Sequence, residues 1–194
     1  MTKNVILAGV GGQGLLSIAA VLGEAARAEG LHLKQAEVHG MAQRGGVVQS
    51  HVRISDRAIH SDLIREGTAD LILALEPMEA LRYVPFLRGD GVLIANRIPL
   101  ENIPDYPDLE RIIAEIEQIE RHVMIDAATL AKEAGSVRCG NMVMLGAAAP
   151  FLGIPESTLL RAVEATFASK GVDVVETNLN GFSLGRAAAD AAAA

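Results

Sequence analysis

The chain has almost no cysteine and few aromatic residues. Its single cysteine is Cys139. One thiol cannot form an internal disulfide, and it cannot build an iron–sulfur cluster or a thiolate zinc site, because these sites need several thiolates. We therefore expect any electron-transfer centre that serves this protein to lie on another chain. Aromatic residues make up 3% of the sequence and tryptophan is absent, so the core must be built from Val, Leu, Ile and Ala.

Positive charge is also scarce. The 17 Lys and Arg residues are outnumbered by 24 Asp and Glu residues, which gives a net charge of −7. An acidic chain without a dense basic stripe is a poor nucleic-acid binder. No apolar run approaches the roughly 20 residues that a membrane span needs, and the N-terminus lacks the layout of a signal peptide. We expect a cytoplasmic protein that binds neither nucleic acid nor membrane.

Aliphatic runs alternate with helical patterns along the whole chain. We expect strands over residues 4–8, 31–38, 47–54, 70–75, 92–95 and 122–126, and helices over residues 14–29, 77–83, 109–119, 127–134, 140–152 and 155–169. This alternation predicts a doubly wound, Rossmann-like α/β fold, in which helices cover both faces of a mostly parallel sheet. Residues 47–54 alternate polar with apolar side chains, which favours an antiparallel or near-edge strand.

The end of the chain follows a different pattern. We expect residues 172–185 to be extended and then to turn. The division that we predict is a single domain over residues 1–186, followed by a flexible Ala-rich tail over residues 187–194.

The first expected strand enters a glycine turn, Gly9-Val-Gly11-Gly12-Gln13-Gly14. Gly9 and Gly11 permit backbone angles and close approaches that a Cβ atom would block, and Gly14 lets the following helix pack near the strand. Free N–H groups at the start of that helix would then face an anion. The pattern is typical of a dinucleotide site, with Glu37 about where a ribose-binding acid would sit. A turn used for packing, or for another phosphate, is the alternative.

A second glycine-rich segment, His39-Gly-Met-Ala-Gln43-Arg44-Gly45-Gly46, follows the next expected strand. Three glycines in eight residues cost conformational entropy on folding, so such a loop usually needs unusual backbone angles or a close contact with a ligand or partner. Arg44 can form a bidentate contact with a phosphate or carboxylate. His39 can donate a proton or act as a neutral hydrogen-bond partner. A tight surface loop with a salt-bridged arginine is the alternative.

Other motifs carry less information. Asn141 is either a simple helix N-cap or a side chain that points into the same cleft as the glycine loops. Gly89-Asp90-Gly91 resembles the start of a thiamine-diphosphate motif, but the asparagine that the motif needs about 25 residues later is missing, so we interpret it as a turn. The histidines lack metal-ligand spacing, and no catalytic triad or nucleophile elbow stands out. We therefore expect no metal site.

Taken together, these motifs resemble those of one family. The matching segments are Gly9-Val-Gly-Gly-Gln-Gly14, Glu37-Val-His-Gly-Met-Ala-Gln-Arg-Gly-Gly46, Ser50-His-Val-Arg53, Ala74-Leu-Glu-Pro77, Glu79-Ala-Leu-Arg-Tyr83 and residues 141–146. They resemble the gamma-type domain of the 2-oxoacid:ferredoxin oxidoreductases, and within that family the separate small (beta) subunit of the indolepyruvate enzymes. The resemblance covers about residues 5–167, and the His-Gly-Met-Ala-Gln-Arg-Gly-Gly string is its most specific part.

The resemblance implies an oxidative decarboxylation. A 2-oxoacid, here indolepyruvate or another aryl pyruvate, would be converted to the acyl-CoA while ferredoxin is reduced. Thiamine diphosphate, magnesium and iron–sulfur clusters would lie on a large partner subunit, through which ferredoxin would be reached. This chain would bind no cofactor by itself, would not be active alone, and would contribute contacts to coenzyme A.

The resemblance also suggests roles for individual residues. His39 and Arg44 would act at the reaction site. Phosphate or coenzyme A contacts would come from Gly11, Gly12, Gln13, Gly14, Gln43, Gly45, Gly46 and Asn141. Three alternatives stay open: a gamma subunit for pyruvate or phenylglyoxylate, a stand-alone NAD-binding Rossmann oxidoreductase, and a purely structural subunit whose glycine loops dock onto the large subunit.

Overall fold

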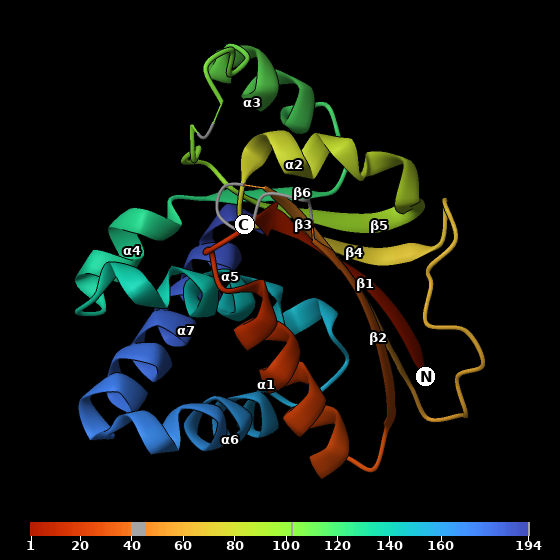
Figure 1. Ribbon diagram of the computed structural model, residues 1–194, viewed down its shortest axis with the longest axis vertical. Coiled ribbons are helices and arrows are strands. Elements are labelled where there is room, and N and C mark those ends of the chain that lie inside the picture. Colours follow the sequence, from red (N-terminus) through yellow and green to blue (C-terminus); the bar gives the residue numbers. More distant parts are fainter. Residues whose placement is uncertain (40–45, 102, 194) are drawn as a thin grey trace.

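The computed structural model describes residues 1–39, 46–101 and 103–193. A six-stranded sheet in the order β2-β3-β1-β4-β5-β6 forms its centre (Figure 1). The strands are β1 (Thr2–Val10), β2 (His32–His39), β3 (Val47–Ser55), β4 (Ala69–Ala74), β5 (Leu87–Asn96) and β6 (His122–Ile125). The strand positions agree with the aliphatic runs of the sequence.

Strand β3 is antiparallel to both of its neighbours, whereas β1, β4, β5 and β6 pair in parallel. β2 is antiparallel to β3 and therefore points the same way as β1. The alternation in residues 47–54 correctly predicted an antiparallel strand next to the edge. The mostly parallel α/β sheet is confirmed, with one reversed strand inserted between β1 and β2.

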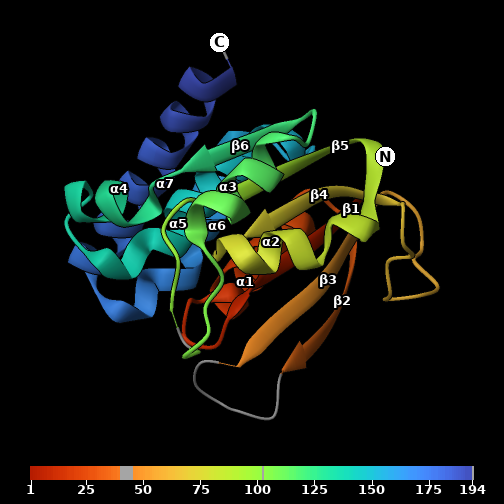
Figure 2. The ribbon, with the colours of Figure 1, turned by 90° about the horizontal axis from the view of Figure 1, so that it is seen from above.

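Helices cover both faces of the sheet. The helices are α1 (Leu15–Ala28), α2 (Pro77–Arg82), α3 (Leu109–Glu117), α4 (Ala127–Glu133), α5 (Gly140–Ala148), α6 (Glu156–Phe167) and α7 (Val172–Ala193). Figure 1 shows α2 and α3 on one side of the sheet and α1, α5 and α6 on the other, and Figure 2 views the molecule from the side of α2 and α3. Two aliphatic cores result, a large one under α1, α5, α6 and α7 and a smaller one under α2 and α3.

Two local expectations were wrong. Residues 172–185, expected to be extended, belong to the 22-residue helix α7. Gly89-Asp90-Gly91, expected to be a turn, lies inside β5 where its pairing with β4 shifts register. A Cβ atom on Gly91 would come within 2.9 Å of the Ala69 carbonyl oxygen, so the glycine is needed where the two strands crowd together.

The glycine turn lies at the same edge of the sheet as His39 and Gly46, the two described ends of the second glycine-rich segment. β1 and β2 point the same way, so their carboxyl ends emerge side by side with the start of β3 between them. The Gly11 N–H donates a hydrogen bond of 2.9 Å to the Gly46 carbonyl oxygen and so joins the glycine turn to the base of the second segment. This edge is the place where an α/β sheet of this kind binds ligands.

Candidate functional site at the carboxyl edge of the sheet

The sheet has a topological switch point between β1 and β4. The two strands are parallel neighbours, but α1, which follows β1, packs in the large core, and α2, which follows β4, packs on the opposite face. The connections that follow β1 and β4 therefore leave the sheet towards opposite faces. A crevice opens beyond the strand ends at such a place, and ligands of open α/β sheets bind in it.

The glycine turn is shaped by its backbone angles and by neighbouring side chains. Gly12 and Gly14 have φ values of 103° and 86°, a region that L side chains rarely adopt. A Cβ on Gly9 would lie 2.7 Å from the Gln13 Oε1 atom, and one on Gly14 would lie 2.6 Å from the Asn141 Nδ2 atom. The close approach at Gly9 agrees with the prediction, whereas Gly14 makes room for α5 rather than for the strand.

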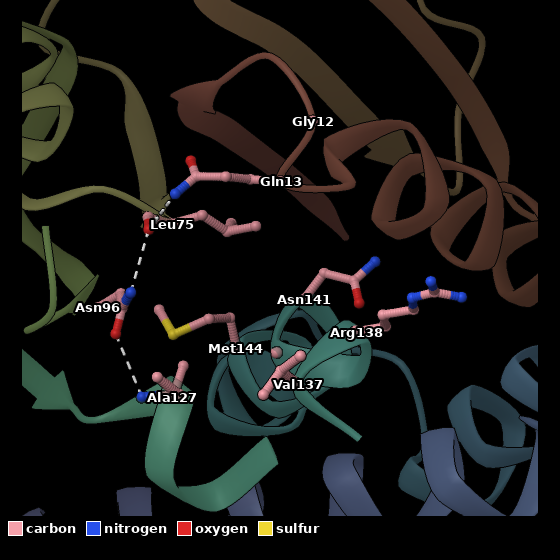
Figure 3. Close-up of a pocket in the computed structure, with 11 residues that line it drawn as sticks. Gly12, Gln13, Leu75, Asn96, Ala127, Val137, Arg138, Asn141 and Met144 are labelled. Carbon is pink, nitrogen blue, oxygen red and sulfur yellow. Dashed lines mark hydrogen bonds between the residues drawn. The ribbon is translucent and has the colours of Figure 1, made fainter. Parts of the chain in front are cut away.

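Gln13 holds the turn against the strand ends (Figure 3). Its Oε1 accepts from the Val10 N–H at 2.8 Å, and its Nε2 donates to the Leu75 carbonyl at 3.0 Å. Asn96, at the end of β5, donates to the same carbonyl at 3.2 Å, and its Oδ1 accepts from the Ala127 N–H at 3.1 Å. These bonds connect β1, β4 and β5 to the start of α4, so the crevice wall is preorganised.

Asn141 lies beside the glycine turn, as one of its two interpretations predicted. Its Nδ2 donates to the Gly14 carbonyl at 3.2 Å, and its Oδ1 accepts from the Met142 N–H at 3.0 Å. The side chain is 8% exposed. Asn141 thus brings the start of α5 against the start of α1, which no side chain caps.

The second glycine-rich segment is described only at its ends. His39 is the last residue of β2 and is aligned with Val48 of β3, and Gly46 accepts the hydrogen bond from Gly11. The predicted site residues Gln43, Arg44 and Gly45 lie outside the described residues. The Gly11 N–H, expected to be open to a phosphate, is already used in that bond.

Three cavities meet at Gly12. The first, about 320 Å³, is the crevice between the glycine turn, Asn96 and the start of α5. The second, about 480 Å³, lies between the starts of α1 and α7. The third, about 360 Å³, runs from Gly12 towards Glu37, whose carboxylate accepts from the Gln35 side chain at 2.9 Å. Ligands of ordinary size occupy cavities of this scale.

Two buried acids lie beneath this edge, at the start of α2. Glu76 and Glu79 are fully buried. Glu76 accepts from the Glu79 N–H at 2.9 Å and from the Tyr106 hydroxyl, and Glu79 pairs with Arg82 at 2.9 Å. Burial raises the pKa of Glu79, which the Arg82 partner opposes. Burial and the bond to Glu76 raise the pKa of Tyr106. The hydrogen bond from Tyr106 thus holds its segment of the chain against the start of α2.

The arrangement is suited to binding rather than to covalent chemistry. Gly12 and Gly14 bend the backbone so that the uncapped start of α1 faces the cavities, and a helix start of this kind attracts anions. In the described part of the chain, no three His, Cys, Asp or Glu side chains are grouped so that they could hold a metal ion. Among the same residues, no helix is long and apolar enough to cross a membrane.

The sequence interpretation missed three residues at this site. Asn96 lies in the crevice, Arg138 lies where the crevice meets the second cavity, and Lys170 lies in the second cavity. Figure 3 shows Arg138 extending away from Asn96. A signal existed for Asn96, because it directly follows the aliphatic run of residues 92–95 and so comes at the carboxyl end of a parallel strand. No local pattern marked Arg138 or Lys170.

Comparison with known proteins identifies the family. The family model described as pyruvate ferredoxin/flavodoxin oxidoreductase matches residues 4–188. The chain is 39% identical to the indolepyruvate oxidoreductase subunit IorB of Archaeoglobus fulgidus, covering 95% of this chain and 94% of that protein. It is 31% identical to the 2-oxoglutarate synthase subunit KorC of Methanothermobacter marburgensis, covering 96% of each.

Solved structures agree with this assignment. The gamma subunit of a keto/oxoacid ferredoxin oxidoreductase from Geobacter sulfurreducens superposes with a TM-score of 0.73 at 26% identity, covering 98% of this chain and 99% of that one. The 2-oxoglutarate:ferredoxin oxidoreductase from Magnetococcus marinus, solved with 2-oxoglutarate, coenzyme A and succinyl-CoA, gives 0.77 at 25% identity. There the similarity covers 98% of this chain and 31% of the longer one. The chain belongs to the pyruvate ferredoxin/flavodoxin oxidoreductase family, the 2-oxoacid:ferredoxin oxidoreductases.

Proposed function

We propose that this chain is the small subunit of an indolepyruvate:ferredoxin oxidoreductase. The observation that carries the proposal is its identity of 36–39%, over nearly full length, to archaeal proteins named indolepyruvate oxidoreductase subunit IorB. Identity to proteins named 2-oxoglutarate synthase subunit KorC is lower, at 31–32%. The reaction would convert an aryl pyruvate and coenzyme A to the acyl-CoA, with reduction of ferredoxin.

The redox and decarboxylation chemistry would lie on a larger partner chain. One cysteine cannot ligate a cluster, and the Cys139 thiol is buried with its Sγ atom 3.0 Å from the Ser136 carbonyl oxygen. Residues 89–91 form part of β5, with Asp90 paired to Arg88, which supports placing the thiamine site on the partner. The partner's thiamine diphosphate, magnesium and clusters would supply those steps.

The residues of this chain would bind and orient coenzyme A. The start of α1, with Gly12 and Gly14, would offer backbone N–H groups to phosphate. His39, Gln43, Arg44, Gly45 and Gly46 would add contacts from the second segment. Gln13 and Asn141 support the turn through the bonds described above. Orienting the thiol and excluding water are recognised sources of rate.

Anaerobic purification of this chain from its source tests the proposal. The expected result is a brown complex with a large thiamine-containing chain, and dye reduction that requires both indolepyruvate and coenzyme A. A colourless chain that purifies alone and binds NAD would contradict the proposal. Activity with pyruvate or phenylglyoxylate instead of indolepyruvate would keep the family role and change the substrate.

A further inference from the structure

Strand β2 ends the sheet, and its outer side is open. In the sheet order β2 pairs with β3, and among the residues that the structure describes no strand pairs with its other side. Figure 2 shows β2 as the outermost strand, at the end of the sheet away from β6. An edge strand directs backbone N–H and C=O groups outwards, and another strand can pair with this row of groups.

Strand β2 lacks most of the features that protect such an edge. It has eight residues and no proline, and its pairing with β3 shows no register shift. The strand at the opposite edge, β6, has four residues and packs beside α7. Short strands, prolines, bulges and covering elements are the usual protection of an edge. We therefore expect the long edge of β2 to be covered by another strand in solution.

The side chains of β2 alternate between the two faces of the sheet. Leu33 packs against the large core, so the odd-numbered residues face α1 and the even-numbered residues face the other way. On that other face Val38 is 53% exposed. Lys34 is also exposed there, and its Nζ donates to the His60 carbonyl at 3.4 Å. This edge therefore presents an apolar side chain and a cation four residues apart.

The sequence of β2 is compatible with antiparallel pairing to a second copy of itself. Residues opposite each other in such a pair share a face of the sheet, so the twofold axis must pass through a residue. With the axis at Ala36, Lys34 lies opposite Val38 of the second copy, and Gln35 lies opposite Glu37. The alkyl part of a lysine can pack on a valine, and an amide is compatible with a carboxylate. This register opposes no like charges.

The neighbouring registers are less favourable. An axis at Lys34 or at Glu37 would place two identical charges directly opposite each other, which is destabilising. An axis at Gln35 would place the aliphatic Leu33 opposite Glu37. The charges of the strand therefore favour pairing about Ala36.

We propose that the edge of β2 is a self-association surface, on which the β2 strand of a second copy of this chain pairs antiparallel about Ala36. The two sheets would then form one continuous sheet. Because the axis reverses the direction of the strands, the carboxyl edges of the two copies would face opposite ways, and each crevice would stay open to a larger chain. The inference does not rest on the function proposed above.

Sedimentation equilibrium of the full chain tests the inference. A contact confined to one strand edge is small, so we expect a dissociation constant on the order of 10–100 µM. The test variants are Val38→Lys and Val38→Glu, at an exposed position opposite Lys34 of the second copy. The matched controls are Val172→Lys and Val172→Glu, at the exposed first residue of α7. Far-ultraviolet circular dichroism and urea unfolding establish that all four variants are folded.

The expected result is a reversible dimer of the native chain. Val38→Lys should weaken it at least about threefold and Val38→Glu should strengthen it at least about threefold, because each dimer contains the contact with Lys34 twice. The Val172 variants should stay within about twofold of the native value. A chain that is monomeric at every concentration, or a dimer on which the two Val38 variants have no opposite effects, would overturn the inference. Slower hydrogen exchange in β2 only after a larger chain is added would also overturn it, by assigning the edge to that chain.

Discussion

At Gly14, both the backbone conformation and the packing against Asn141 require a glycine. Its φ of 86° is in the left-handed region, and a Cβ would contact the Asn141 amide. Gly14→Ala should therefore destabilise the fold by about 2 kcal/mol or more, from backbone strain plus displacement of Asn141. Gly23→Ala is the matched control, because Gly23 lies within α1 and a Cβ atom there would meet nothing within 4 Å, and it should stabilise by about 0.5–1 kcal/mol. Urea unfolding of both variants measures this, and equal effects would contradict the account.

His51 makes stability depend on pH. The ring is 5% exposed, its Nδ1 accepts from the Ile64 N–H at 3.0 Å, and it stacks edge-on against Phe86. Burial lowers the pKa of His51, opposed by the charge of Asp62. The unfolded chain then binds the proton more readily, so stability is complete above the unfolded pKa of about 6.5 and is lost as pH falls below it.

Urea unfolding at pH 7.5 and pH 5.5 measures this loss. The loss of stability between the two pH values should be smaller in His51→Gln than in the native chain. His60 is exposed, so His60→Gln should lose as much stability as the native chain. The same pH dependence in all three proteins would remove His51 from this role.

Helices α5 and α7 are packed so closely that glycine is needed on both. A Cβ on Gly146 would lie 1.9 Å from the Phe182 carbonyl oxygen, and one on Gly185 would lie 1.8 Å from the Val143 carbonyl oxygen. Gly146→Ala should destabilise the fold by about 3 kcal/mol or more, because the two helix backbones must move apart to make room for the methyl group. Ser183→Ala, on the exposed face of α7, should change stability by less than about 0.5 kcal/mol. A Gly146→Ala variant as stable as the native chain would show that the helices can separate freely.

This packing also explains which elements the sequence could predict. Aliphatic runs revealed the parallel strands, and the alternation of Gln49, His51 and Arg53 revealed the reversed one. Helix α7 was missed because Gly181 and Gly185 lower helix propensity. Contact with α5 outweighs that cost, and it is a contact between distant segments that no local pattern encodes. The same reason hid Arg138 and Lys170, which come together only when α7 packs beside the start of α5.

At the scale of the whole molecule, the fold places one binding edge on a rigid support. The glycine turn, the end of β5 and the starts of α4 and α5 are joined by hydrogen bonds from Gln13, Asn96 and Asn141. The glycine turn could be predicted as a site because its residues are consecutive in sequence. The cavities around it could not, because their walls come from segments that are far apart along the chain.

The role that we propose for this chain is to supply coenzyme A contacts in a complex with a larger partner chain. Its most direct test is the coenzyme A dependence of indolepyruvate-driven dye reduction by the large partner chain, alone and reconstituted with this chain. We expect the partner alone to have little coenzyme A-dependent activity. Arg44→Ala should raise the KM for coenzyme A about tenfold or more without loss of assembly, whereas Arg57→Ala should leave it unchanged. Equal rates and an equal KM with and without this chain would contradict the account.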